Sequence, residues 1–272
     1  MKPRWIDTHN HLFVLPHEQQ KAEVTDARAC GVAAGLVCAG GTDNFEAAIR
    51  CAHEWDSCYA LALHPLYLRE SWRSDLQVLE DALLKNREDP RLAAVGECGL
   101  DFSDDCSVPR DIQEAVFSEH LKLARRLKLP LSLHGRGAMD IVLKHLRRIQ
   151  PLCGVIHAFN GSAAQAEQFI KLGFKIGYGG AMTYNGSKRI RALLAALPEH
   201  AWVLETDCPD IPPSRTRERE ENPQSVLADI ADYGLEAAEL RSISPEESSR
   251  QSQRNTLEVF PAFSAILAAA PQ

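Results

Sequence analysis

The stretch WIDTHNHL, residues 5–12, distinguishes a barrel from an open sheet in this chain. Its apolar start predicts a strand, and because residues two apart on a strand point the same way, His9 and His11 would present two imidazoles to one side. Imidazole is a common metal ligand, so the pair is expected to form half of a metal site. An open nucleotide-binding sheet would instead need a glycine-rich loop after its first strand.

The rest of the chain alternates short apolar runs with amphipathic segments. Eight runs predict strands, at residues 5–12, 32–39, 59–64, 92–100, 129–134, 154–158, 174–180 and 201–206. Helical spacing between them is clearest at residues 110–127, 139–149, 162–172 and 187–197. This alternation predicts a parallel sheet covered by helices, and eight such units suit a single α/β domain, a (β/α)8 TIM barrel over residues 1–272. A doubly wound open sheet is the alternative.

Composition and charge narrow the class of protein. No run is long and apolar enough to cross a bilayer, and the start of the chain lacks the apolar segment of a signal peptide, so we expect a cytoplasmic location. The eight cysteines are scattered without a C-x-x-C pair, which predicts free thiols. A net charge of −7 argues against a protein that coats nucleic acid, so a phosphate-bearing substrate would need a local basic or metal-filled cleft.

Metal-binding side chains recur at the ends of the predicted strands. In a barrel these ends converge on one face, where active sites of this fold lie. Strand ends one, four, five, six and eight offer six such residues: His9, His11, Glu97, His134, His157 and Asp207. Six ligands are too many for one tetrahedral ion and suit two divalent metals that share a bridging group and act on a phosphodiester. The mixture of imidazole and carboxylate suits Zn, Mn, Fe or Ni better than Mg alone.

Seven ordered motifs make the chain similar to the TatD family of metal-dependent hydrolases, members of the amidohydrolase superfamily whose described activities include deoxyribonuclease. The motifs are IDTHNHL, ALHP, VGECGLD, LPLSLHGR, HAFNGS, LETDCP and the downstream Asn222-Pro223. The resemblance implies that His9, His11, Glu97 and Asp207 hold one metal, while Glu97, His134 and His157 hold the second. It thereby makes Glu97 the bridging carboxylate. Asp207 would also lie beside the attacking water, which makes it the expected general base.

Other polar residues near the strand ends are weaker candidates for substrate contacts. His64 follows the third strand and could contact substrate or make a structural hydrogen bond. Arg136 could clamp a phosphate oxygen or be solvated. Asn160 and Ser162 lead into a helix whose amides could bind an anion, although a plain N-cap at Ser162 explains the same residues. Asp101 is expected to orient a ligand or a loop.

Some positions depart from the family pattern. Gly137 and Ala138 follow LHGR where many members carry an acidic residue, and Phe102 replaces a frequent tyrosine. No metal ligand is lost, but substrate contacts become less predictable. The charged loop 211–222 could act as a substrate-facing lid through Arg215 or Arg217, or be an ordinary solvated loop.

Three functions are compatible with these features. The first is a phosphodiesterase that acts on DNA or its fragments, similar to a 3'-5' exonuclease. The second is a hydrolase of a small amide, ester or lactone with the same site. A phosphodiesterase needs an open, basic groove, whereas the second predicts a closed pocket with few cations. The third, a non-catalytic scaffold, is disfavoured because all six polar positions are intact. No motif implies an obligate protein partner.

Overall fold

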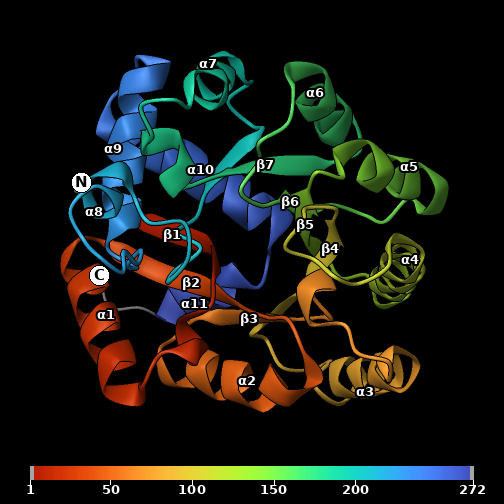
Figure 1. Cartoon of the computed structure of the whole chain (residues 1–272). Helices are drawn as coiled ribbons and strands as arrows, with labels where there is room; N and C mark the ends of the chain where they lie inside the picture. Colours follow the sequence, from red (N-terminus) through yellow and green to blue (C-terminus); the bar gives the residue numbers. More distant parts are fainter. Residues whose placement is uncertain (1–2, 270–272) are drawn as a thin grey trace.

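Eight parallel strands in sequential order form the barrel of this computed structural model, which describes residues 3–269 (Figure 1). The ends of the predicted domain, residues 1–2 and 270–272, lie outside the described residues. The strands are β1 (Trp5–Asn10), β2 (Val32–Ala39), β3 (Cys58–Leu61), β4 (Leu92–Asp101), β5 (Leu131–Arg136), β6 (Gly154–Ile156), β7 (Phe174–Tyr178) and β8 (Trp202–Leu204). The predicted (β/α)8 TIM barrel is therefore confirmed.

Helices surround the strands in Figure 1. They are α1 (His17–Ala29), α2 (Phe45–Glu54), α3 (Trp72–Lys85), α4 (Arg110–Leu127), α5 (Met139–Ile149), α6 (Ala163–Lys171), α7 (Lys188–Ala196), α8 (Ser214–Arg217), α9 (Asp229–Arg241), α10 (Pro245–Val259) and α11 (Phe263–Ala269). Short 3-10 turns follow four strands: η1 (Leu12–Val14), η2 (Thr42–Asn44), η3 (Pro65–Tyr67) and η4 (Gly180–Thr183). No helix within residues 3–269 is long and apolar enough to cross a membrane.

Several predicted strand ends were wrong by a few residues, for a common reason. The ladder of β1 ends at Asn10 rather than residue 12, and β8 ends at Leu204 rather than residue 206. In both places the chain leaves the strand ladder. Its backbone groups and polar side chains then form hydrogen bonds between the first strand and the last. β3 also ends early, at Leu61, and the chain then turns so that His64 donates its amide to the Gly40 carbonyl at 2.8 Å.

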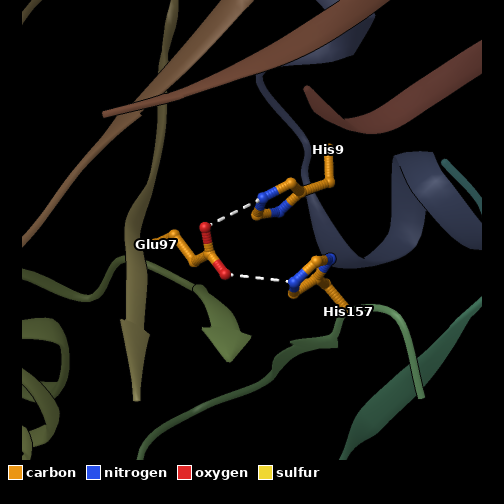
Figure 2. Close-up of side chains that lie close together, drawn as sticks. All are labelled: His9, Glu97 and His157. Atoms are coloured by element: carbon orange, nitrogen blue, oxygen red, sulfur yellow. Dashed lines mark hydrogen bonds and ion pairs between the residues drawn. The ribbon is translucent and has the colours of Figure 1, made fainter. Parts of the chain in front are cut away.

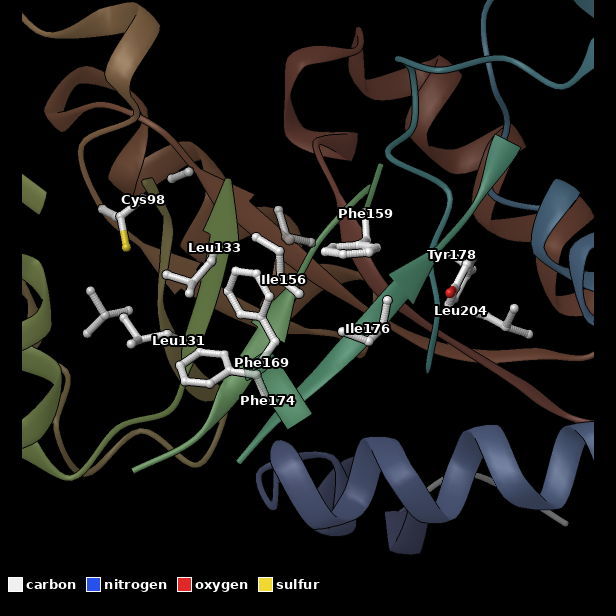
Figure 3. Packing of buried hydrophobic residues seen from close by; sticks show 14 of the residues in the cluster. Cys98, Leu131, Leu133, Ile156, Phe159, Phe169, Phe174, Ile176, Tyr178 and Leu204 are labelled. Atoms are coloured by element: carbon white, nitrogen blue, oxygen red, sulfur yellow. The ribbon is translucent and has the colours of Figure 1, made fainter. Parts of the chain in front are cut away.

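Two apolar layers hold the barrel together. The outer layer lies between strands and helices and includes Leu131, Ile156 and Phe169, which Figure 3 shows among the side chains that pack there. The inner layer fills the barrel at the end away from the site, where Phe260 and Phe263 pack against small and branched strand residues. Because this end is plugged by side chains, the opposite end is the one that can receive a ligand.

The first and last strands meet through polar groups. The Asp207 amide donates to the His9 carbonyl at 2.9 Å, and the Thr8 hydroxyl donates to the Leu204 carbonyl at 2.9 Å. The fold thus nearly closes between β1 and β8. As a consequence, Asp207 lies beside His9 although 198 positions separate them along the chain.

Candidate metal centre

The six predicted side chains come together at the open end of the barrel, around the carboxylate of Glu97. One oxygen, Oε2, lies 3.2 Å from Nε2 of His9 and 3.4 Å from Nε2 of His11. The same two imidazole nitrogens lie 3.7 Å and 3.4 Å from Oδ1 of Asp207. Two imidazoles and two carboxylates therefore face one point.

The other oxygen of Glu97 faces a second group. Oε1 lies 2.9 Å from Nδ1 of His134 and 3.0 Å from Nε2 of His157. Figure 2 shows how His9 and His157 each approach a different oxygen of Glu97. Their rings are stacked, with centroids 4.0 Å apart and planes 13° from parallel. Glu97 is thus the one side chain that the two groups share.

Behind each of these imidazoles, a polar group faces the other ring nitrogen. Nδ1 of His11 donates to the Cys38 carbonyl at 2.7 Å, and Nδ1 of His9 contacts the Ser132 hydroxyl at 2.9 Å. Such partners fix which nitrogen presents its lone pair to the site. In this first group both partners are neutral.

The second group differs because its partners are carboxylates. Nε2 of His134 donates to Oδ2 of Asp101 at 3.0 Å, and Nδ1 of His157 lies 3.4 Å from Oε1 of Glu205. A carboxylate behind an imidazole raises its basicity as a ligand. The predicted orienting role of Asp101 has a direct contact to support it.

Asp7 joins the strands that hold the site. Its carboxylate accepts the Thr206 hydroxyl at 2.6 Å, the Thr206 amide at 2.9 Å and the His9 amide at 3.1 Å. Burial raises the pKa of Asp7 to about 7, against the effect of these hydrogen bonds. This network holds the backbone on either side of His9 and Asp207 in place.

Electrostatics keep the site carboxylates charged. Burial opposes ionisation of Glu97, but the imidazoles of His64, His157 and His9 outweigh it and hold its pKa well below the ordinary value. Burial likewise opposes ionisation of Asp207, whose pKa is lowered by His157 and His11. Both groups therefore remain ionised and able to act as ligands at neutral pH.

The spacing of the donor atoms fits divalent metal ions. Ligands of a tetrahedral zinc ion at its usual bond lengths lie roughly 3.3 Å from one another. The four distances in the first group run from 3.2 to 3.7 Å. In addition, Oδ1 of Asp207 is buried without a hydrogen-bond partner, which is costly for a carboxylate oxygen unless a cation balances it.

His64 lies at the same place and is not among the six predicted ligands. Its Nδ1 accepts the Leu66 amide at 3.3 Å, and its Nε2 lies 3.4 Å from Oε1 of Glu97. With Glu97 and His134 it forms a further group of side chains that could hold a metal ion. His64 also lines the cleft, so substrate contact and a structural hydrogen bond both stay predictions for it.

A wide cleft of about 1390 Å³ opens above the six side chains. Its lining contains two arginines, Arg110 and Arg136, among the residues that the structure describes. Six carboxylates share that lining, namely Glu97, Asp101, Glu114, Asp140, Asp207 and Asp210. The cleft has the size that an extended substrate needs but not the basic surface that was expected for a nuclease.

The weaker candidates for substrate contact are engaged in other interactions. Arg136 lines the cleft but pairs with Asp105 at 2.7 Å. Asn160 also lines it, and its side-chain oxygen accepts from Arg189 at 2.7 Å. Ser162 is the N-cap of α6, where its hydroxyl accepts the Gln165 amide, and it is not part of the cleft lining.

The predicted lid loop, residues 211–222, makes contacts with the body of the barrel. Arg215 forms ion pairs with Asp229 and Asp232 on α9, which turns it toward that helix. Arg217 lies over the ring of Tyr184, 4.8 Å from its centroid, and Tyr184 lines the cleft. Of the two proposed lid arginines, Arg217 is therefore the one at the edge of the site.

Sequence reasoning missed three residues that support the site. Glu205 and Ser132 contact the backs of site histidines, and Asp7 bonds both site strands. A signal for Glu205 was available, because it precedes Asp207 by two residues. The structure adds that a Cβ atom at Gly177 would come within 2.3 Å of the Glu205 carboxylate, which the sequence alone does not show.

Comparisons with known proteins agree with this geometry. Residues 6–261 match the profile of the family described as TatD related DNase. A protein of Escherichia coli K12 named as an uncharacterized metal-dependent hydrolase, YjjV, is 36% identical over 94% of this chain and 98% of its own length. A Klebsiella pneumoniae protein named 3'-5' ssDNA/RNA exonuclease TatD is 34% identical over 72% of this chain and 74% of its own length.

A solved crystal structure has a fold similar to that of this chain. The crystal structure of the Escherichia coli YjjV protein superimposes with a TM-score of 0.86 at 35% identity, covering 96% of this chain and 99% of that one. The whole barrel is therefore shared, and with it the end of the barrel at which the six side chains meet.

Proposed function

Because the chain belongs to the TatD family of metal-dependent hydrolases, we propose that it cleaves phosphodiester bonds of DNA or of nucleic-acid fragments, as a 3'-5' exonuclease does. The observation behind this proposal is the position of Glu97, whose two oxygens face two separate groups of imidazoles. A carboxylate so placed suits a pair of ions rather than one. The name of the Klebsiella relative supports a nucleic-acid substrate.

The proposed ligands follow from which atoms face each oxygen of Glu97. His9, His11 and Asp207 would complete the first position, and His134 with His157, which both face Oε1 of Glu97, the second. Two divalent ions, chosen from Zn, Mn, Mg, Fe or Ni, would supply an acidified water and charge stabilisation at the phosphate oxygens. Asp101 and Glu205 would hold the two second-position imidazoles in the orientation that ligation needs.

Asp207 is the proposed general base. It lines the cleft, and its partnerless Oδ1 is the carboxylate oxygen beside His9 and His11. There it can accept a proton from the attacking water and return it to the leaving oxygen once the ester bond breaks. Its position is set by its own amide, which donates to the His9 carbonyl.

A second candidate function is hydrolysis of a small amide, ester or lactone at the same site. The observation in its favour is the shortage of cations, since Arg110 and Arg136 are the cleft's two among the residues that the structure describes. The size of the cleft favours the first candidate, because about 1390 Å³ exceeds what a small ligand fills.

A substrate panel separates the two candidates. Enzyme loaded with Mn, Mg or Zn would be assayed on single-stranded DNA, RNA, dinucleotides, bis-p-nitrophenyl phosphate and lactones. We expect turnover of the phosphodiesters, abolished by chelation and restored by added metal. Turnover of lactones alone would refute the phosphodiesterase and support the alternative.

Two broader proposals accompany this function. We propose a single domain over residues 1–272, supported by one eight-stranded sheet that uses strands from β1 to β8. We also propose a cytoplasmic location without an obligate protein partner. The free thiols of all eight cysteines support a reducing compartment.

A further inference from the structure

Three exposed apolar side chains line the cleft. They are Val14 at the end of η1 and the neighbouring Leu66 and Tyr67 in η3, whose exposed fractions are 55%, 36% and 64%. Within residues 3–269, seven large hydrophobic side chains are exposed, and these three line one cleft. Exposed apolar side chains that gather in one place mark a binding surface more often than scattered ones do.

Tyr67 is held close to the metal-binding side chains. Two atoms of its ring lie 3.2 and 3.4 Å from the position that a Cβ atom on Gly40 would take, so the ring rests against a residue without a side chain. Its centroid is 5.4 Å from that of His64, whose Nε2 is 3.4 Å from Glu97. One imidazole therefore separates Tyr67 from the shared carboxylate.

The cleft offers few free positive charges that could bind a phosphate backbone. Arg136 is paired with Asp105, and Arg110 lies over the ring of Phe102, 4.5 Å from its centroid. Of the six carboxylates in the lining, Glu97 and Asp207 belong to the metal positions, and the other four disfavour phosphates elsewhere in the cleft. Affinity for a nucleic acid must then come from another source, and stacking of bases on aromatic side chains is the sequence-tolerant source that single strands use.

We propose that Tyr67 stacks an unpaired base next to the scissile phosphate. A single-stranded end presents such a base, whereas a base in a duplex is already stacked on both faces. This inference rests on the proposed phosphodiesterase function and adds a residue that selects the substrate.

The test compares two oligonucleotides that differ only in their bases. One carries normal thymines at its 3' end, and the other carries abasic tetrahydrofuran nucleotides there. We expect wild-type enzyme to prefer the first by roughly tenfold in kcat/KM, through a lower KM. Tyr67→Ala should lose this preference, while Tyr67→Phe should keep it because the ring remains. Leu152→Ala serves as the matched control, since Leu152 is 57% exposed and precedes β6 at the opposite end of the barrel.

The results of this comparison separate failure of the Tyr67 proposal from failure of the proposed phosphodiesterase function. A wild-type enzyme that cleaves neither oligonucleotide would overturn both the function and this inference. An active enzyme whose preference is the same in Tyr67→Ala would overturn only the role of Tyr67.

The salt dependence of KM is a second test. Since two arginines can neutralise at most two phosphates, raising salt from 50 to 200 mM should increase KM by less than roughly tenfold. A steeper increase would contradict binding by stacking.

Discussion

Nε2 of His134 donates a hydrogen bond to Oδ2 of Asp101 over 3.0 Å, so Nδ1 is the nitrogen that faces Glu97. Asp101→Asn keeps an acceptor there but removes its charge, and this should weaken binding at the second metal position by roughly 10–100-fold. Isothermal titration of metal-free protein would measure the effect. Asp105→Asn removes an exposed carboxylate of the neighbouring loop and is the control. An equal loss in that control would mean that general charge, and not the orientation of His134, is responsible.

Asp207→Asn tests the general base. The amide cannot accept a proton from water, so the turnover of a phosphodiester reporter should fall by more than ~100-fold. Far-ultraviolet circular dichroism and the melting temperature should remain close to those of the wild type, because the amide of residue 207 still donates to the His9 carbonyl. Retention of wild-type turnover in this variant would remove Asp207 from the mechanism.

Gly177→Ala tests whether the position of Glu205 matters. A Cβ atom at residue 177 would lie 2.3 Å from Oε2 of Glu205, a buried carboxylate oxygen, so the Glu205 side chain would have to shift. Such overpacking should lower the free energy of unfolding by about 1–3 kcal/mol, measured by urea denaturation. Gly186→Ala is the matched control because an added Cβ atom there meets nothing within 4 Å. Equal stability of the two variants would contradict close packing around Glu205.

His120 should make the protein sensitive to acid. It is fully buried, its Nε2 accepts the Leu63 amide at 3.0 Å, and burial lowers its pKa to about 4. Between pH 6.5 and 4 the unfolded chain binds a proton at this histidine that the folded chain does not, so stability falls as pH falls. The contribution by pH 4.5 is about 2 kcal/mol.

The comparison for His120 uses the pH dependence rather than the stability at one pH. Denaturation of wild type and His120→Gln from pH 7.5 to 4.5 should show a shallower loss in the variant, whatever its starting stability. His200→Gln, at an exposed histidine, should follow the wild type. Parallel profiles for wild type and His120→Gln would show that His120 does not titrate as expected.

Much of the fold was predictable because its periodicity is local. Helices α4 and α5 begin and end at the predicted residues, 110–127 and 139–149, since their apolar positions recur along one face. The ends of β1 and β8 were not predictable to the residue. They depend on contacts such as the hydrogen bond between the Asp207 amide and the His9 carbonyl, which lie far apart in the sequence.

The candidate site was predictable in its residue types and less so in its surroundings. Alternation along strands and the convergence of their ends bring His9, Glu97 and Asp207 to one place. Two of the partners behind the imidazoles were missed. Ser132 on β5 and Glu205 just after β8 are brought there by the fold, and alternation gives the direction of a side chain but not its neighbour. The excess of carboxylates over arginines in the cleft was also missed, because the sequence does not show which side chains line the cleft together.

The central claim is that Glu97 joins two metal positions. Its most direct test is the metal content per chain after dialysis against Zn or Mn, measured by elemental analysis for wild type and Glu97→Gln. We predict two ions per chain in the wild type and a loss at both positions in the variant, because each group contains one oxygen of Glu97. A wild type with a single ion, or a variant that retains two, would contradict the account.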